Sequence, residues 1–222
     1  MVTAAVISDL HLSWESPQPF FRHSEDKFAA FLSFLSLEFE QVVLLGDVFE
    51  CLATPERSPA RALTKALDRS FLAPYLHRAD FTYIPGNHDG VAAPALGLPT
   101  ERWLPGEEPV LLQHGHQFDF WPAEVAAPIS FIGGVLQRGG LRKAIRFLRR
   151  AEDRFHRKMG RVERVGVQAA ERGAAVVVNG HTHAKAESQT GGALYLNPGC
   201  AGTDLTFVAI DTDQRKYGVH EW

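Results

Sequence analysis

Short apolar runs recur along the chain, and a glycine, proline or polar residue closes each of them. They cover residues 2–8, 41–45, 81–84, 110–113 and 174–179. Runs of this length between turn-forming residues are typical of buried β-strands. Later runs at residues 194–196 and 205–210 predict two more strands, with the turn Asn197-Pro198-Gly199 between them.

Two longer segments have the spacing of amphipathic helices. Residues 24–38 repeat apolar side chains three or four positions apart, which predicts one apolar helix face. These side chains are Phe28, Phe31, Leu32, Leu35 and Phe39. Residues 59–76 predict a second helix, broken at Pro74. Because helices and strands alternate early and strands dominate later, we expect an α/β core with antiparallel additions, in one domain over residues 1–222.

The stretch from residue 118 to about residue 166 lacks strand-like runs. Its apolar residues recur at helical spacing, with arginine and lysine at other positions. They are Leu141, Ile145, Leu148, Phe155, Met159 and Val162. The pairs Gly133-Gly134 and Gly139-Gly140 divide the stretch into a shorter apolar piece and a long basic helix. We expect a helical insertion between two core strands, where it can form a wall or lid over a site.

Composition narrows the class of protein. The chain is 45% hydrophobic and 22% charged, with a net charge of −3, and no apolar run is long enough to span a membrane. Its first residues lead straight into a predicted strand and lack the basic start of a signal peptide. Two cysteines do not make a disulfide framework. These features predict a soluble, cytoplasmic protein.

The charge is distributed unevenly. Between Arg138 and Arg164, eleven lysines and arginines stand against three acidic residues, so this segment carries a charge of +8. The rest of the chain carries −11. A basic helix of this kind usually presents a solvated face. The alternative is contact with an anionic partner, which could be a phosphate, a nucleotide or the surface of a membrane that the protein touches peripherally.

Histidines and acidic residues gather in five short clusters, four of which directly follow a predicted strand. The clusters are Asp9-Leu10-His11, Gly46-Asp47, Gly86-Asn87-His88-Asp89, His114-Gly115-His116 and Gly180-His181-Thr182-His183. They contain six of the ten histidines. Because neighbouring strands end at one edge of a sheet, these side chains can converge there. Carboxylate, imidazole and amide oxygen together suit a pair of divalent metals.

The types of side chain in the five clusters suggest a role for several of them in a two-metal hydrolase. Asp47 is the candidate bridging ligand, because both carboxylate oxygens can bind, and Asn87 adds a neutral carbonyl. Such a metal pair attracts a phosphate and turns a bridging water into a hydroxide near neutral pH. His88 is the candidate general acid that donates a proton to the leaving-group oxygen.

The five clusters resemble, in order, the motif blocks of the calcineurin-like metallophosphoesterase superfamily: D-x-H, G-D, G-N-H-[DE], H and G-H-x-H. The resemblance spans residues 9–183 and implies a four-layer α/β/β/α sandwich with two metals at the sheet edge. It implies that one metal is bound by Asp9, His11, Asp47 and His183, and the other by Asp47, Asn87, His114 and His181. It also implies that His88 is the leaving-group acid and that the substrate phosphate contacts His116, Asn87 and His88.

Longer blocks and the helical insertion are also similar to the UDP-2,3-diacylglucosamine pyrophosphatases, in which the insertion holds acyl chains. The blocks are Ser8-Asp9-Leu10-His11-Leu12, Gly46-Asp47-Val48-Phe49-Glu50 and His114-Gly115-His116-Gln117-Phe118-Asp119. The chain departs from that pattern at His88, where many of those enzymes have arginine, and at His116, where many have aspartate. Ala184-Lys185 replaces their usual Arg-Pro.

The leading hypothesis is a dinuclear metal-dependent phosphoesterase that hydrolyses a phosphodiester or a monoester. Mn²⁺ is the expected ion, and Fe, Zn²⁺ and Co²⁺ fit the same ligands. The alternative substrate is a UDP-linked acylated sugar. A nuclease ranks lower, because the chain has no separate nucleic-acid-binding module. A non-catalytic metal-binding scaffold also ranks lower, because every motif residue is present.

Overall fold

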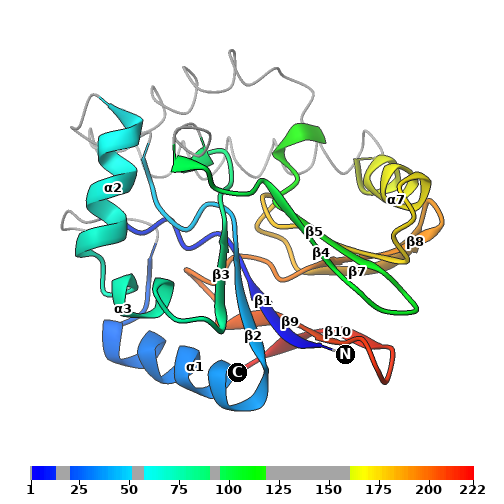
Figure 1. Ribbon diagram of the computed structural model, residues 1–222, viewed down its shortest axis with the longest axis horizontal. Helices are drawn as coiled ribbons and strands as arrows, with labels where there is room; N and C mark the ends of the chain where they lie inside the picture. Colours follow the sequence, from blue (N-terminus) through cyan, green and yellow to red (C-terminus); the bar gives the residue numbers. More distant parts are fainter. Residues whose placement is uncertain (1, 14–20, 52–57, 91–95, 119–160) are drawn as a thin grey trace.

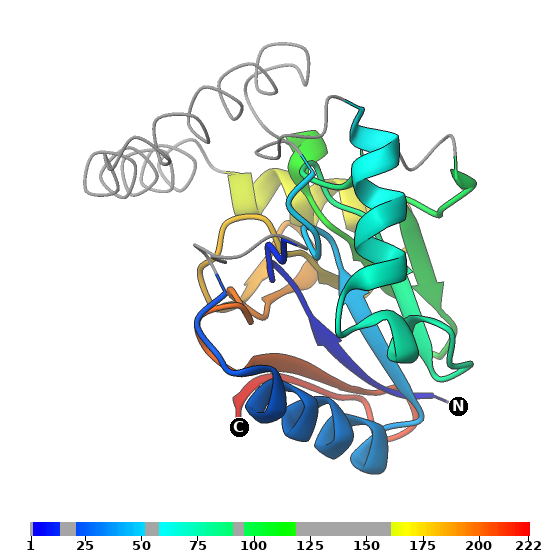
Figure 2. The same ribbon diagram turned by 90° about the vertical axis from the view of Figure 1, so that its left-hand side faces the viewer.

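A computed structural model describes residues 2–13, 21–51, 58–90, 96–118 and 161–222. Within these ranges, two five-stranded sheets pack face to face, and helices cover their outer sides (Figure 1). The turned view shows α1 and α7 on opposite sides of the two sheets (Figure 2). The predicted α/β/β/α sandwich is confirmed.

The first sheet, sheet 1, has the strand order β10-β9-β1-β2-β3. Its strands are β1 (Thr3–Ile7), β2 (Gln41–Leu45), β3 (Phe81–Ile84), β9 (Thr206–Asp211) and β10 (Lys216–Glu221). β1, β2 and β3 are parallel, with Val6 opposite Val43 and Leu45 opposite Ile84. β9 runs antiparallel to both β1 and β10. The carboxyl ends of β1, β2 and β3 therefore lie at the same edge.

The second sheet, sheet 2, has the order β4-β5-β6-β8-β7. Its strands are β4 (Glu101–Leu104), β5 (Val110–Gln113), β6 (Val176–Val178), β7 (Ala186–Thr190) and β8 (Ala193–Asn197). β5, β6 and β8 are parallel in the centre, and the antiparallel strands β4 and β7 form the edges. The ends of the central strands again lie together.

Three apolar cores fill the spaces between the layers. Alternate residues of β1 serve two of them: Ala4 and Val6 face sheet 2, whereas Ala5 and Ile7 face the helices. Burial on both faces explains why the strand sequences are continuous apolar runs. The third core lies between sheet 2 and α7 (Arg161–Glu171), which contributes Val165 and Ala169.

The helices over sheet 1 begin at recognisable signals. Ser24 caps α1 (Glu25–Glu38) by accepting a hydrogen bond from the Lys27 N–H at 3.2 Å. α1 then buries Phe28, Phe31, Leu32 and Leu35, as the spacing predicts. α2 covers Pro59–Arg69 and α3 covers Ala73–Leu76. Pro74 lies in the first turn of α3, where proline is tolerated, so the predicted break falls before this residue.

Several elements differ from the sequence-based expectations. The strands β4, β7 and β10 were not predicted, and β6 is shorter than the run at residues 174–179. Most of the predicted helical insertion, together with Asp119, lies outside the described residues. Its predicted end near residue 166 falls inside α7, which packs on sheet 2. Each helix in the described ranges is too short or too polar to cross a membrane.

Candidate metal centre

The loops that follow the parallel strands have an unusual backbone conformation. Six non-glycine residues in the described ranges have a left-handed φ between 48° and 68°, and five of them are predicted metal ligands. The five are Asp9, His11, Asp47, His181 and His183. Non-glycine residues rarely adopt this left-handed region, although aspartate and histidine adopt it more often than most. The chain therefore turns sharply at each of these ligands, just beyond the strand ends.

Backbone hydrogen bonds hold neighbouring loops together. The His11 N–H donates to the Asp47 carbonyl at 2.8 Å, so the loops after β1 and β2 continue the pairing of their strands. In sheet 2, the Gly180 N–H donates to the His114 carbonyl at 3.1 Å. Gly180 has to be a glycine here, because a Cβ would lie 2.8 Å from Asp9 Oδ2. The ligand loops thus form one connected layer over both sheet edges.

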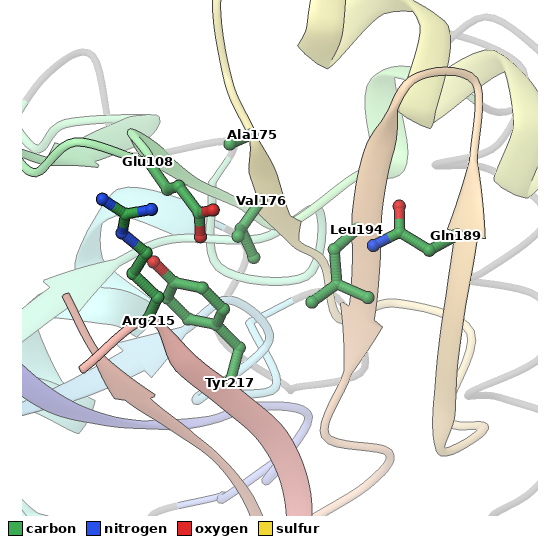
Figure 3. Close-up of a pocket in the computed structure, with 7 residues that line it drawn as sticks. All are labelled: Glu108, Ala175, Val176, Gln189, Leu194, Arg215 and Tyr217. Carbon is green, nitrogen blue, oxygen red and sulfur yellow. The ribbon is translucent and has the colours of Figure 1, made fainter.

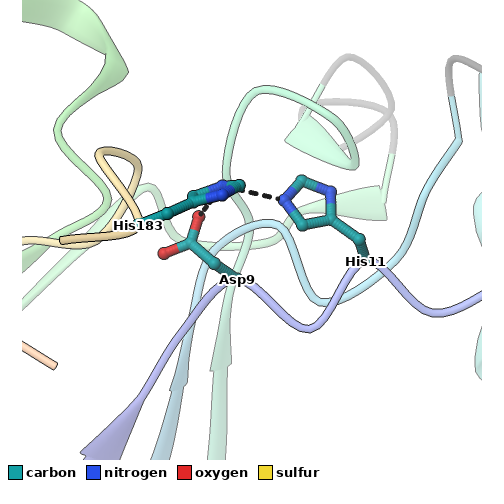
Figure 4. A group of neighbouring side chains, drawn as sticks. All are labelled: Asp9, His11 and His183. Carbon is teal, nitrogen blue, oxygen red and sulfur yellow. Dashed lines mark hydrogen bonds and ion pairs between the residues drawn. The ribbon is translucent and has the colours of Figure 1, made fainter. Parts of the chain in front are cut away.

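Asp9, His11 and His183 form the first group (Figure 4). His183 Nε2 lies 3.3 Å from Asp9 Oδ1 and 3.1 Å from His11 Nε2. Donor atoms that share one tetrahedral metal at about 2.1 Å lie roughly 3.4 Å apart. The spacing of this group therefore fits a shared metal ion. Two of its members come from sheet 1 and one comes from sheet 2.

Asp47, His114 and His181 form the second group. His114 Nε2 lies 3.3 Å from Asp47 Oδ2, and the two rings His114 and His181 meet edge to face with centroids 5.2 Å apart. His114 Nδ1 donates to the Leu45 carbonyl at 3.1 Å, because a carbonyl can only accept. Nε2 is therefore the ring nitrogen that faces Asp47. Burial lowers the pKa of His114, but the charge of Asp47 outweighs it and raises that pKa to about 9, so Nε2 would release its proton when the ring binds a metal.

Asp47 lies between the two groups. Its Oδ2 is 3.9 Å from His11 Nε2, 3.9 Å from His88 Nε2 and 3.3 Å from His114 Nε2. Its other oxygen, Oδ1, accepts a hydrogen bond from the His88 N–H at 2.8 Å. This central position is the one that a ligand shared by two metals requires.

Three predicted ligands present a buried atom with no hydrogen-bond partner among the described residues. The atoms are Asp9 Oδ1, Asn87 Oδ1 and His114 Nε2. A buried polar atom that is left without a partner costs about 1–3 kcal/mol. Asp9 Oδ1 and His114 Nε2 each face an ionisable side chain at 3.3 Å without forming a hydrogen bond, and a divalent cation fits oxygen and imidazole donors at such a place. The residues present therefore fit a metal centre.

Burial and mutual charge control the ionisation of this site. Burial raises the pKa of Asp9, but the interactions with His183 and His114 together outweigh it and lower that pKa to about 2. Burial lowers the pKa of His11 to about 4, so its imidazole is neutral at pH 7. Burial alone would raise the pKa of Asp47, but the charges of His114 and His88 hold this pKa well below the usual value. The carboxylates are thus ionised and His11 is neutral, which are the forms that bind metals.

Glu50 is a site residue that the sequence analysis missed. Its buried Oε2 lies 2.8 Å from His88 Nδ1 and 3.6 Å from His11 Nδ1. Burial alone would raise the pKa of Glu50, but these imidazoles hold it below the usual range. The chain Gly46-Asp47-Val48-Phe49-Glu50 contained the signal, an acidic residue in an otherwise apolar segment just after a ligand.

Asp89 fixes the loops rather than contacting the metal groups. Its Oδ2 accepts hydrogen bonds from the Val48 and Phe49 N–H groups at 2.8 and 3.1 Å, and its Oδ1 accepts one from Gly86 at 2.5 Å. Burial and the nearby charge of Asp47 raise the pKa of Asp89 to about 6. Asp89 therefore caps the ligand loops by accepting hydrogen bonds from their backbone.

The exposed side chains of the site mark the face that a substrate can reach. His88 is 12% exposed and His183 is 28% exposed, whereas Asp9, His11, Asp47 and His114 are almost completely buried. The predicted phosphate contact His116 has its ring 5.7 Å from His114 and 6.4 Å from His181. The structure therefore brings His88, Asn87 and His116 to the same edge as the two groups.

A separate hollow of about 280 Å³ lies at the opposite ends of the strands (Figure 3). Its lining combines an apolar floor with four polar side chains, Glu108, Gln189, Arg215 and Tyr217. The floor comes from the first residues of β6 and β8, and hence from the ends remote from the metal groups. This hollow contains none of the predicted site residues.

Comparisons with known proteins agree with this fold. The model of the family described as "Calcineurin-like phosphoesterase superfamily domain" matches residues 2–215. A hypothetical protein of Pyrococcus horikoshii OT3 is 13% identical with a TM-score of 0.53, covering 100% of this chain and 88% of its own. A mutant of Vps29 from Entamoeba histolytica is 14% identical with a TM-score of 0.50, covering 99% of both chains.

A predicted phosphoesterase of Streptococcus pneumoniae TIGR4 is 17% identical with a TM-score of 0.48, covering 100% of this chain and 98% of its own. No curated protein matches the chain. At identities this low, the two structures with TM-scores of 0.53 and 0.50 support a shared fold alone.

Proposed function

Because the chain belongs to the calcineurin-like phosphoesterase superfamily and is a metal-dependent phosphoesterase, we propose that it works with two divalent ions. Asp9, His11, Asp47 and His183 would hold one ion, and Asp47, Asn87, His114 and His181 would hold the other. When bound, the ions would supply a bridging hydroxide as the nucleophile and positive charge for the phosphate. The reaction is hydrolysis of a phosphate ester bond.

The observation that carries this proposal is the set of buried ligand atoms without partners. Asp9 Oδ1, Asn87 Oδ1 and His114 Nε2 belong to three different loops and two sheets, yet all of them lack a hydrogen bond within the described part of the chain. A purely structural role would leave these atoms paired. Two of the three compact groups of carboxylate and imidazole donors, Asp9–His11–His183 and Asp47–His114–His181, support the same conclusion.

His88 and Glu50 supply the proton chemistry of the proposal. His88 Nδ1 donates to Glu50 Oε2, which favours the charged imidazolium and directs the opposite nitrogen toward Asp47. In this position the Nε2–H of His88 can pass its proton to the oxygen of the departing alcohol. Asn87 and His116 would orient the phosphate beside it.

The most direct test is metal-dependent hydrolysis by protein stripped of metal with a chelator. We expect Mn²⁺ to restore turnover of an aryl phosphodiester or the matching monoester, and the preferred ester identifies the substrate class. Asp47→Asn should reduce turnover by at least 1000-fold, because it removes the shared carboxylate charge. The matched control, Asp68→Asn on the exposed side of α2, should retain full activity. Undiminished turnover in Asp47→Asn would refute the proposal.

Manganese is the ion that we propose first, and activity with Fe, Zn²⁺ or Co²⁺ should be compared on the same stripped protein. A UDP-linked acylated sugar is the second substrate to test, with release of UMP as the readout. The segment that would hold its acyl chains, residues 118–166, lies mostly outside the described residues. Membrane contact through this basic segment and a cytoplasmic location therefore stay predictions.

A further inference from the structure

The hollow shown in Figure 3 lies between the two sheets. Tyr217 of β10 belongs to sheet 1, whereas Val176 of β6 and Leu194 of β8 belong to sheet 2. These three side chains are also part of the apolar core between the sheets, so the lining of the hollow continues that core. The volume is about 280 Å³. At about 30 Å³ for each water-sized group, such a space holds a molecule of roughly nine non-hydrogen atoms.

The charges around the hollow leave one carboxylate unbalanced. Arg215, in the turn between β9 and β10, forms an ion pair with Glu107, in the turn between β4 and β5. Glu108 forms no ion pair within the described ranges, although it lines the hollow on the same side as Arg215 (Figure 3). A carboxylate beside apolar surface is poorly hydrated, so its attraction for a cation that enters the hollow is stronger than in open water.

Tyr217 adds an aromatic ring and a polar atom to the same side. Its hydroxyl oxygen is buried and has no hydrogen bond of good geometry among the described residues. Burial and the neighbouring Glu108 raise the pKa of Tyr217 to about 12, so the hydroxyl keeps its proton at pH 7. The oxygen can still accept a hydrogen bond, and the face of the ring attracts a cation within about 6 Å. Both features suit the positively charged group that Glu108 attracts.

The backbone at Arg215 is unusual for a residue outside the metal centre. Arg215 has a left-handed φ of 53°, and every other non-glycine residue with such a φ in the described ranges is a proposed metal ligand. Glycine would adopt this conformation without strain, so an arginine is expected here only if its side chain contributes an interaction. The ion pair with Glu107 is that interaction. It joins two turns beside the hollow and balances the charge of Arg215 without using Glu108.

We propose that this hollow binds a small organic ammonium ion, in which a protonated amine is attached to a short apolar group. The amine would lie between the Glu108 carboxylate and the Tyr217 side chain, and the apolar group would cover Val176 and Leu194. An anion is disfavoured because it would face Glu108, and a neutral molecule would leave that carboxylate unpaired. The hollow is remote from the metal groups, so this inference is independent of the proposed hydrolysis.

The test uses 2-phenylethylamine, which matches the hollow in size and is an ammonium ion at pH 7. The amine is titrated into the isotope-labelled full-length chain, and the backbone amide signals are followed by NMR. We expect saturable shifts at Val176, Leu194 and Tyr217, with a Kd of about 1 mM or below, and none at His114 or His183. The uncharged 2-phenylethanol should bind about 10-fold more weakly, and the anion phenylacetate more weakly still.

Glu108→Gln removes the charge and keeps the size of the side chain. This variant should bind the amine about 10-fold more weakly than wild type and bind 2-phenylethanol equally well. Glu221→Gln is the matched control, because Glu221 is an exposed acidic residue of β10 that pairs with Lys185 at 3.0 Å. It should keep wild-type affinity for the amine.

Three results would each overturn the inference. They are the absence of saturable shifts around the hollow, binding of 2-phenylethanol or phenylacetate as tight as that of the amine, and wild-type affinity for the amine in Glu108→Gln. Both variants should keep full metal-dependent hydrolysis, because neither residue belongs to the proposed metal centre. Failure of this inference is therefore distinguishable from failure of the proposed function.

Discussion

Glu50 shows how a single carboxylate can serve two imidazoles. Its Oε2 lies between His88 Nδ1 and His11 Nδ1, so it orients the proposed acid and a proposed ligand together. The imidazoles of His88 and His11 hold the pKa of Glu50 below its usual range, so Glu50 carries a negative charge beside His88. We expect that charge to favour the protonated form of His88.

Glu50→Gln should shift the pH dependence of turnover in a defined direction. Without the carboxylate, His88 loses its proton at lower pH, so the alkaline limb of the kcat profile should move down by about one pH unit. The acidic limb and metal binding should change less. Glu101→Gln, which removes an exposed partner of Arg172, is the control and should leave the profile unchanged. If the alkaline limb of the profile does not move in Glu50→Gln, then Glu50 has no role in the proton transfer.

The residue types of the site were predictable because polar side chains stand out after apolar strands. Asp9, Asp47 and His114 each follow such a run, and the structure brings them to one sheet edge. The position of Glu50 could not be predicted in the same way, because an exposed position is the ordinary expectation for a charged residue in a loop. Only the three-dimensional contacts show that Glu50 is buried.

At the scale of elements, the site depends on how closely the loops approach one another. Gly180 follows β6 and passes beside the end of β1, where a Cβ would lie 2.7 Å from Ser8 Oγ and 2.8 Å from Asp9 Oδ2. Ser8 Oγ itself donates to Asp9 Oδ2 at 2.6 Å. The space that glycine leaves free is therefore the space that the ligand carboxylate occupies.

Gly180→Ala should displace the Asp9 carboxylate and weaken metal binding at least 10-fold, measured by titration of Mn²⁺ into stripped protein. Gly90→Ala is the matched control, because its Cβ would meet nothing nearer than Pro85 at 3.9 Å. Neither glycine has a left-handed φ, so neither substitution adds backbone strain. Equal affinities in the two variants would contradict this account of Gly180.

The elements that the sequence predicted well are those with a buried face. α1, β1, β2 and β5 follow their apolar patterns closely. β7, Ala186–Thr190, is mostly exposed at the edge of sheet 2 and has no apolar pattern, so pairing with β8 alone makes it a strand. β10 alternates Tyr217 and Val219 with polar residues, a weak signal that pairing with β9 completes. Pairing with a neighbouring strand, and not the local sequence pattern, therefore determines where the edge strands of the two sheets form.

At the scale of the whole molecule, the proposed metals would join the two sheets. Asp9, His11 and Asp47 come from loops of sheet 1, and His114, His181 and His183 come from loops of sheet 2. Polar contacts also join the sheets elsewhere in the described part: Arg102 of β4 donates to Thr82 and Gln41. Metal ions bound at these sites should therefore stabilise the fold as well as activate the enzyme.

Removing metal should lower the unfolding temperature. At a free metal concentration 100-fold above Kd, each site contributes about 2.7 kcal/mol, so two sites contribute roughly 5 kcal/mol. For a chain of this size, that corresponds to a shift of roughly 10–20 °C in Tm. Scanning calorimetry with Mn²⁺ and with chelator measures the shift, and Asp47→Asn should show a much smaller one. A Tm that chelation leaves unchanged would contradict the proposed link between the sheets.

The position of β1 in its sheet also affects the order in which the structure can form while the ribosome synthesises the chain. β1 carries Asp9 and His11 at its end, yet it lies between β2 and β9, and β9 covers residues 206–211. During synthesis, β1 is therefore paired on both sides only after β9 has been made. Because two of the proposed ligands follow β1, we expect stable metal binding only after the synthesis of β9.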